Sequence, residues 1–400
     1  MRVSTLTFYN QGVTAMQNQQ ARLQQTELQI ASGLRVSKPS DDPAAAVKVL
    51  DLKASIDSLD QYSRNSAIAE ASLGFEESVV ANVNNTLQRI RELSVQGNNS
   101  TYQDRDKQSI AQEIYQRLDE LVSLANTRDS QGEYIFGGFK VDSPPFVEID
   151  GEVSYRGDQG QRLLQIGDGS KVATRDSGLE VFQRIRSGDG NINVRSADSN
   201  SGSAVVGAFG LVATFQPDDY TVTFDQASPD SPITYQVTDS ASNVVSTGDY
   251  NAGSSISFAG AQFKLGGTPA PGDEIFVSPS GYQDIFATVK SIADALNAPA
   301  PDAAARADFH NKMGQGLASL DQALDKVTAI RAGIGARLNN LETLEEINQD
   351  FKLQMQTTLS ETQDLDYAEA ISRFNLQLTA LQAAQQAFVK ASGLSLFQYL

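Results

Sequence analysis

Apolar residues near the start of the chain recur at alternating steps of three and four positions. The repeat runs through Leu6, Tyr9, Val13, Met16, Gln20, Leu23, Glu27 and Ile30. Six of these eight residues are apolar, which places a narrow stripe along one side of a helix, as in a coiled-coil seam. Such a stripe is stable only when a second helix covers it. Ser32 and Gly33 then interrupt the repeat, so the first helix is predicted to end there.

Two more helices are predicted in the first third of the chain. Asp42 precedes Pro43, and proline suits the first position of a helix while it disfavours helical backbone in the residue before it, so Asp42 is predicted to cap a helix. An apolar stripe continues from there to about Gln96. A third helix is predicted to begin at the weak capping box formed by Thr101 and Asp104.

The C-terminal part of the chain repeats this design. Proline is absent after Pro301, and a stripe with seven apolar members of eight consists of Leu317, Leu320, Leu324, Val327, Arg331, Ile334, Leu338 and Leu341. One long helix is therefore predicted from Asp302 to about Gln363. A last helix carries a second stripe, made of Tyr367, Ile371, Phe374, Leu378, Leu381, Gln385 and Phe388.

The two terminal stripes are predicted to pair with each other, with other copies of the chain, or with both. We expect their apolar members to form an assembly interface: Leu6, Val13, Met16, Leu23, Ile30, Tyr367, Ile371, Phe374, Leu378, Leu381 and Phe388.

The middle of the chain has a different pattern. Residues 146–280 contain 17 of the 30 glycines, and β-branched or aromatic runs lie at 220–224, 233–237 and 275–277. Short runs of this kind between glycines and prolines are typical of antiparallel strands. The chain is therefore predicted to be an α+β multidomain protein, a coiled-coil-like helical bundle with an inserted, mostly antiparallel β domain. The expected parts are terminal helices (1–40 and 365–400), a helical rod domain (41–145 and 281–364) and a β-rich outer domain (146–280).

Composition narrows the classes of function. With 31 basic and 49 acidic residues the net charge is −18, which disfavours binding to nucleic acid or to anionic lipid. There is no cysteine, so disulfides and thiolate chemistry are excluded. The first twenty residues lack the apolar run of a cleaved secretion signal, and no stretch has the length and apolarity of a membrane span.

Candidate residues for catalysis or metal binding are few. His310 is the single histidine, and its polar surroundings predict an ordinary exposed helix residue. The segment Asp189–Asn193 starts like a calcium loop, but Val194 and Asn200 stand where that motif needs glycine and glutamate, which favours a plain turn. We expect no enzyme activity, no cofactor and no bound metal.

Several motifs, in order along the chain, resemble the flagellin superfamily. They are Gln29–Val36 (QIASGLRV) with Ser40–Ala44 (SDDPA), Leu87–Gln96 (LQRIRELSVQ) and Arg331–Arg337 (RAGIGAR). Within the superfamily, three further segments look like the hook-associated proteins of the hook–filament junction: Pro39–Pro43 (PSDDP), Gly132–Gly138 (GEYIFGG) and Ser395–Leu400 (SLFQYL).

This resemblance implies a structural, self-assembling subunit of the extracellular bacterial flagellum, located at the junction of hook and filament. It implies other copies of the chain, the first hook-associated protein and flagellin as partners, and an export chaperone of the FlgN type at the C-terminal region. It also implies export by the flagellar type III apparatus without cleavage of a signal peptide. Two alternatives remain at this stage: a filament flagellin, and a secreted enzyme whose β insert is catalytic.

Overall fold

The computed structural model describes residues 5–393, which form two compact units. One unit takes in the described residues up to Asn65, residues 166–168 and the described residues from Thr343 onward. The other contains residues 66–165 and 169–342. Among the described residues, no helix combines the length and apolar character that a membrane crossing requires.

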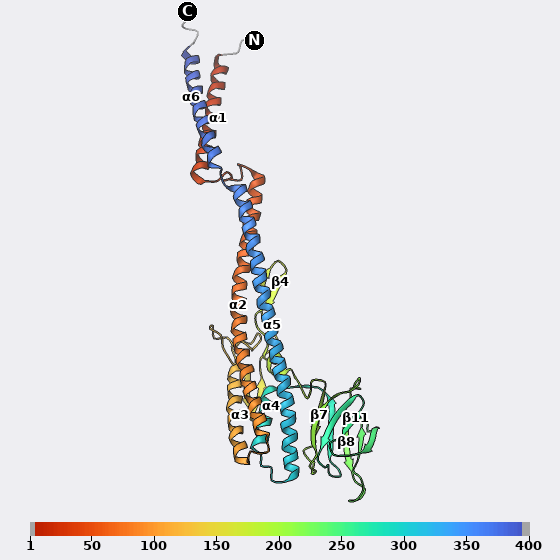
Figure 1. Cartoon of the computed structure of the whole chain (residues 1–400). Coiled ribbons are helices and arrows are strands. Elements are labelled where there is room, and N and C mark those ends of the chain that lie inside the picture. The colour runs from red at the N-terminus through yellow and green to blue at the C-terminus, as the bar shows by residue number, and fades with distance from the viewer. Residues whose placement is uncertain (1–4, 394–400) are drawn as a thin grey trace, which may run out of the picture. The chain divides into compact units, whose positions relative to one another are not determined.

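The first unit is built from four helical segments. They are α1 (Thr5–Ser32), α6 (Tyr367–Gly393), the beginning of α2 (Pro43–Gly97) and the end of α5 (Ala303–Gln363). Helices α1 and α6 lie side by side and antiparallel, so that the start of α1 lies beside the end of α6 (Figure 1). Asp42 caps α2 as predicted, because its Oδ1 accepts the Ala45 N–H at 3.0 Å.

The connections to α1 and α6 are bound to each other within this unit. The Arg35 N–H donates to the Gln363 carbonyl at 2.8 Å, and the Leu365 N–H donates to the Gly33 carbonyl at 2.9 Å. Gly33 ends α1 with a φ of +73°, a conformation that glycine adopts at little cost. In the same unit, Lys352 of α5 pairs with Asp60 of α2 at 2.5 Å.

The helical part of the second unit has a fully buried core. It contains the rest of α2 and α5 together with α3 (Asp104–Ala125) and α4 (Ile285–Asn297), and α3 packs against α4. The completely buried side chains include Leu73, Leu87, Ile90, Ile114, Leu121, Val289, Leu320, Val327 and Ile334. The predicted cap of α3 is wrong by two residues, since Gln103 and Asp106 form the capping box, in place of Thr101 and Asp104.

A cluster of four phenylalanines joins these helices to the first strands. The Phe146 ring lies 5.2 Å from Phe182 and 5.1 Å from Phe286, and Phe136 lies 5.2 Å from Phe182. Phe182 belongs to a π-helical turn, η1 (Leu179–Gln183). The chain also forms three short two-stranded pairs: β1 (Phe146–Ile149) with β2 (Glu152–Tyr155), β3 (Leu163–Gly167) with β4 (Ser170–Ala173), and β5 (Ile185–Arg186) with β14 (Tyr282–Gln283).

The remaining strands form a two-layered β sandwich (Figure 1). One antiparallel sheet has the order β10-β9-β8-β13-β6, from Val244–Asp249, Thr234–Thr238, Tyr220–Asp225, Glu274–Pro279 and Ile192–Ser196. The other has the order β11-β12-β7, from Ser255–Phe258, Ala261–Gly266 and Val205–Leu211. The buried cluster between them includes Val222, Phe224, Phe263 and Ile275. The α+β prediction and its three strand segments are confirmed, whereas helix α4 was not predicted from the sequence.

Candidate assembly interface

The side chains covered between α1 and α6 occupy two positions of each heptad. On α1 they are Gly12, Met16, Gln19, Leu23, Thr26 and Ile30. On α6 they are Ala370, Phe374, Gln377, Leu381, Ala384 and Phe388. Both sets advance by alternating steps of four and three residues, which keeps one face of each helix against the other. One heptad position carries large apolar residues, and the other carries small or polar ones.

Polar residues in this seam bind each other. The Thr26 hydroxyl, only 3% exposed, donates to Gln377 Oε1 at 2.9 Å. The Gln19 side-chain amide donates to the Gln377 main-chain carbonyl at 3.2 Å. Because a buried polar group is costly when it has no partner, these bonds favour one register of the two helices over its neighbours.

The far end of the seam combines a glycine with an aromatic ring. A Cβ added to Gly12 would lie 2.9 Å from Cδ2 of Phe388, so glycine lets this ring lie directly against α1. The Tyr9 ring packs against the same phenylalanine with centroids 5.1 Å apart. Gly12 therefore stands within a helix, where glycine is unfavourable, because the ring occupies the space of its side chain.

The predicted stripes coincide with the α1–α6 seam at one heptad position and are displaced from it by one residue at the other. Met16, Leu23 and Ile30 lie in the seam, and so do Phe374, Leu381 and Phe388. On α1, the repeat that contains Val13, Gln20 and Glu27 is displaced by one residue from Gly12, Gln19 and Thr26. Val13 is half-buried beside the seam. Leu6 lies in α1, and its side chain falls outside the part that the structure describes.

The other predicted residues of α6 form a separate, exposed stripe. Tyr367, Ile371 and Leu378 are 50%, 49% and 37% exposed, and Val389 continues the stripe at 67% exposed. Their spacing of four, seven and eleven residues puts them on one face of the helix, beside the seam with α1. We call these four residues the α6 outer stripe. Leu378 and Leu381, which are three residues apart, thus differ in their surroundings: Leu381 lies in the seam, and Leu378 is 37% exposed beside it.

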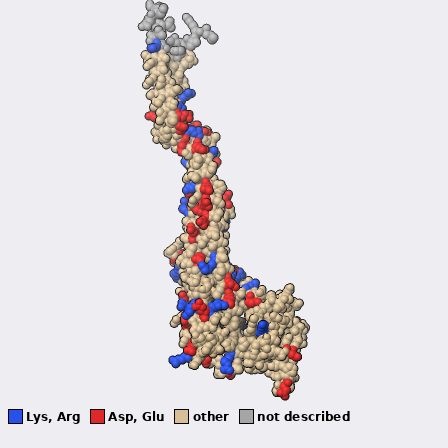
Figure 2. All heavy atoms as spheres, in the orientation of Figure 1, with Lys and Arg blue, Asp and Glu red and all other residues tan. Residues whose placement is uncertain are grey.

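Charged residues are sparse along the α1–α6 pair. The described part of α1 has Arg22 and Glu27, and α6 has Glu369, Arg373 and Lys390. On the face that Figure 2 shows, the pair is covered mainly by uncharged atoms. Depletion of charge together with exposed large apolar residues is typical of the central part of a protein–protein interface.

The single histidine has a structural environment. His310 is half-buried, not exposed as predicted, and its Nδ1 lies 2.9 Å from Oδ1 of Asn98. Burial lowers the pKa of His310, and the nearby Lys107 ammonium lowers it further. Among the described residues, no carboxylate forms a hydrogen bond with His310, so the arrangement there lacks the orienting acid of a catalytic triad.

Asp189 forms a turn, as the sequence favoured. Its Oδ1 accepts the N–H groups of Asn191 at 2.9 Å and Ile192 at 2.8 Å, directly before β6. The carboxylate is therefore used by the turn itself. In the part of the chain that the structure describes, no group of three or more His, Asp or Glu side chains could hold a metal ion.

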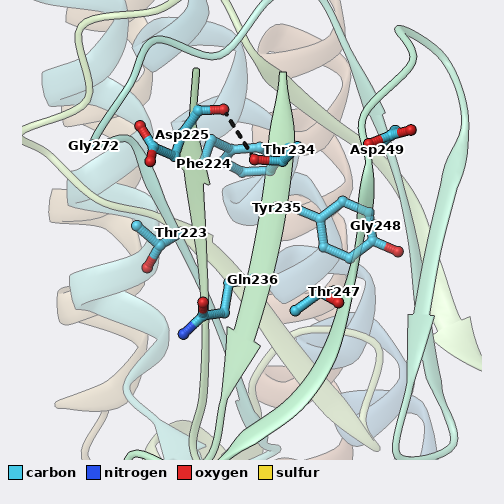
Figure 3. Close-up of a pocket in the computed structure, with 10 residues that line it drawn as sticks. All are labelled: Thr223, Phe224, Asp225, Thr234, Tyr235, Gln236, Thr247, Gly248, Asp249 and Gly272. Carbon is cyan, nitrogen blue, oxygen red and sulfur yellow. Dashed lines mark hydrogen bonds between the residues drawn. The ribbon is translucent and has the colours of Figure 1, made fainter. Parts of the chain in front are cut away.

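A groove of about 590 Å³ lies on the β sandwich, at strands β8, β9 and β10 (Figure 3). Its lining includes Thr223, Gln236, Thr247 and two carboxylates, those of Asp225 and Asp249. The Thr234 hydroxyl donates to the Asp225 main-chain carbonyl at 3.3 Å. The lining contains no nucleophile paired with a base, so nothing in this groove supports the alternative of a catalytic β insert.

Comparison with known proteins separates the remaining alternatives. The bacterial flagellin N-terminal helical region matches residues 3–140, and the bacterial flagellin C-terminal helical region matches residues 317–400. Flagellin of Salmonella derby is 38% identical over 103 residues, which cover 26% of this chain and 20% of that flagellin. The similarity to filament flagellin is therefore partial.

Other proteins match along their whole length. Flagellar hook-associated protein 3 of Escherichia coli (strain K12) is 29% identical over 405 residues, covering 100% of this chain and 99% of that protein. The crystal structure of the flagellar junction protein FlgL from Legionella pneumophila has 31% sequence identity and a TM-score of 0.72, and the match covers 79% of this chain and 100% of that one. The chain therefore belongs to the family of flagellar hook-associated protein 3, the junction proteins FlgL, whose members are structural and not enzymes.

Proposed function

We propose that the chain is the structural subunit that joins the flagellar hook to the flagellin filament, and that it assembles through its terminal helices. One observation carries the proposal: in the α1–α6 pair, large apolar side chains remain exposed after the two helices have covered each other. Several copies arranged side by side would bury these side chains. The sparse charge of both helices supports the same conclusion, since charged residues are depleted from interface cores.

The two faces of α6 have different roles in this proposal. Phe374, Leu381 and Phe388 hold α1 within one chain, and the α6 outer stripe contacts another copy. Each large apolar side chain that becomes buried stabilises an assembly by about 1.5–3 kcal/mol at most. A subunit that repeats around a ring gains this in every copy, so a few residues suffice.

The three predicted parts of the chain receive distinct places in the assembly. Residues 1–40 and 365–400 form its inner layer, residues 41–145 and 281–364 form the rod domain around that layer, and residues 146–280 form the outer domain. The partners in this proposal are the first hook-associated protein on one side and flagellin on the other. Before export, a chaperone of the FlgN type covers the C-terminal region, where the α6 outer stripe exposes large apolar side chains to water.

Complementation of a strain that lacks its junction protein tests the proposal. The wild-type chain should restore filaments, and an antibody against the β sandwich should label one band between hook and filament on intact flagella. Labelling along the whole filament would instead indicate a filament flagellin. Secreted flagellin in the medium, with bare hooks on the cells and the chain present outside them, would refute the junction role.

A further inference from the structure

A short buried segment of the second unit contacts α2, α5 and the turn that follows α3. Residues 174–177 lie between β4 and η1, with Thr174 3% and Ser177 2% exposed. The Asp176 N–H donates to Glu76 Oε1 of α2 at 2.8 Å, and the Ser72 hydroxyl of α2 donates to the Thr174 carbonyl at 3.1 Å. We call residues 174–177 the latch segment.

The arginines around the latch segment are bound to other groups. Arg337 of α5 pairs with Asp176 at 2.5 Å and donates to the Ala173 carbonyl at 3.3 Å. Arg175 pairs with Asp129 and, at 3.3 Å, with Glu133, both in the turn that follows α3. Within the hydrogen bonds of this cluster, neither guanidinium donates to Glu76.

Arg162, which precedes β3, completes the cluster by pairing with Glu133 at 3.3 Å. The neighbour of Glu76 on α2, Glu77, is bound separately by Arg331 of α5 at 2.6 Å. The charged groups that act on Glu76 itself are the Asp176 carboxylate and the guanidiniums of Arg337 and Arg175, and each guanidinium is already paired with another carboxylate.

Glu76 differs from the other carboxylates of this cluster, because the ion pairs among the described residues bind those carboxylates to arginines and do not include Glu76. Its side chain is completely buried, and no described residue forms a hydrogen bond with its Oε2. With Glu76 neutral, Arg337 keeps its partner Asp176, and Arg175 keeps its partners Asp129 and Glu133. With Glu76 ionised, a second carboxylate lies next to that of Asp176 in a completely buried position, where a charge without a direct partner is very costly.

We infer that Glu76 is a proton-dependent latch, which fixes residues 174–177 to α2 while it is neutral and releases them when it loses its proton. The carbonyl oxygen of a neutral carboxyl accepts the Asp176 N–H and adds no charge. After ionisation, repulsion from the Asp176 carboxylate and the cost of burial both favour opening, because opening lets water reach the Glu76 carboxylate.

The titration of Glu76 agrees with this geometry. Burial and, to a smaller extent, the nearby Asp176 carboxylate raise the pKa of Glu76 from 4.5 to about 8, and the Asp176 N–H, Arg337 and Arg175 offset only part of the change. Because the pKa is higher in the folded chain than in the unfolded chain, the stabilising effect of the neutral form is complete below about pH 4.5. It declines as the pH rises and is lost above about pH 8.

Substitution of Glu76→Gln separates protonation from packing, because glutamine keeps the acceptor for Asp176 N–H and cannot ionise. Between about pH 5 and pH 8, the melting temperature of the wild-type chain should fall by about 5 °C or more relative to that of Glu76→Gln. Glu77→Gln is the matched control on the same helix, and it should keep the wild-type pH dependence. The same pH dependence in wild type and Glu76→Gln would overturn the inference.

A second measurement applies to the wild-type chain and does not depend on the folding of a variant. The 13C resonance of the Glu76 side-chain carboxyl, followed by NMR across the pH range, should titrate with a midpoint well above that of an exposed glutamate. Over the same pH interval, amide exchange at Asp176 should accelerate by more than the pH dependence of the intrinsic exchange rate accounts for. A carboxyl midpoint below about pH 5 would overturn the inference.

Discussion

The α1–α6 pair and the helical core of the second unit are both built from apolar stripes on long helices, but they bury those stripes to different extents. In the core, Leu87, Ile114 and Val327 are completely buried by neighbouring helices. In the α1–α6 pair, Met16 and Leu381 are only half-buried, and Leu376 on the side away from α1 is 72% exposed.

The difference in burial shows that one chain buries the apolar stripes of the second unit by itself, whereas the stripes of the α1–α6 pair need further chains to cover them. The second unit combines α3, α4 and long parts of α2 and α5 in one compact body, whereas α1 packs along its length against α6 in the first unit. Two paired helices can cover only a narrow seam, and the other sides of both remain open to further helices. We therefore expect substitutions in the core to affect the isolated chain, and substitutions on the outer stripe to affect only the assembly.

The largest effect on the isolated chain is expected from Leu87→Ala. It should lower the free energy of unfolding of the second unit by about 3–4 kcal/mol, because the lost side chain leaves a cavity among packed helices. Thermal unfolding followed by circular dichroism measures this loss. Leu378→Ala is the control, and a similar loss from it would mean that the outer stripe is already buried in one chain.

The outer stripe should behave in the opposite way. The double substitution Ile371→Ala and Leu378→Ala leaves α6 helical, because alanine has a high helix propensity, and should leave unfolding of the monomer within about 0.5 kcal/mol of wild type. In cells the exported variant should fail to retain flagellin at the hook, so that flagellin accumulates in the medium. Gln386→Ala, exposed on the same helix and off the stripe, should support normal filaments. Normal filaments from the double variant would refute the assignment of this stripe.

The seam between α1 and α6 should respond to a change in shape. Gly12→Val places methyl groups where the Phe388 ring lies, which should destabilise the pairing by about 1–3 kcal/mol. Amide exchange across residues 9–30 should accelerate in this variant. Adding Phe388→Ala removes the ring and should restore part of the protection. If the second substitution gives no recovery, the ring does not occupy the space beside Gly12.

The smallest effect on the helices is expected from removal of the β sandwich. The Ser187 N–H donates to the Gly281 carbonyl at 3.0 Å, so the two ends of the sandwich are adjacent and a direct join is possible. Deletion of 188–280 should lower the stability of the helical part by no more than about 2 kcal/mol and should leave junction formation largely intact. An exported deletion variant that forms no junction would show that the sandwich takes part in assembly.

The apolar pattern predicted the terminal helices, but it marked only one of the two heptad positions at which they contact each other. Large apolar residues at one heptad position, such as Met16 and Leu381, are visible in any hydrophobic pattern. The other position is occupied by Gly12, Thr26 and Gln377, which pack by leaving space or by binding each other. A search for apolar residues at this spacing therefore finds their apolar neighbours in the sequence, such as Val13 beside Gly12 and Leu378 beside Gln377.

Other features depend on contacts between residues distant in the sequence. Helix α4 follows the short strand β14 closely, and only its capping residue Asp284, whose Oδ1 accepts the Phe286 N–H at 2.6 Å, marks its start. Glu76 looks like any surface glutamate in the sequence, because its burial comes from the latch segment about 100 residues later. Such features become visible only when the fold brings the segments together.

The absence of cysteine from the chain allows a direct test of whether the α6 outer stripe contacts another copy. A Leu378→Cys variant should react rapidly with a thiol reagent as a monomer and should be protected on intact flagella. A Ser240→Cys variant, at an exposed turn of the β sandwich, should react rapidly in both states. Protection of position 378 alone is the predicted result, and equally rapid labelling of position 378 in monomer and flagellum would contradict the account.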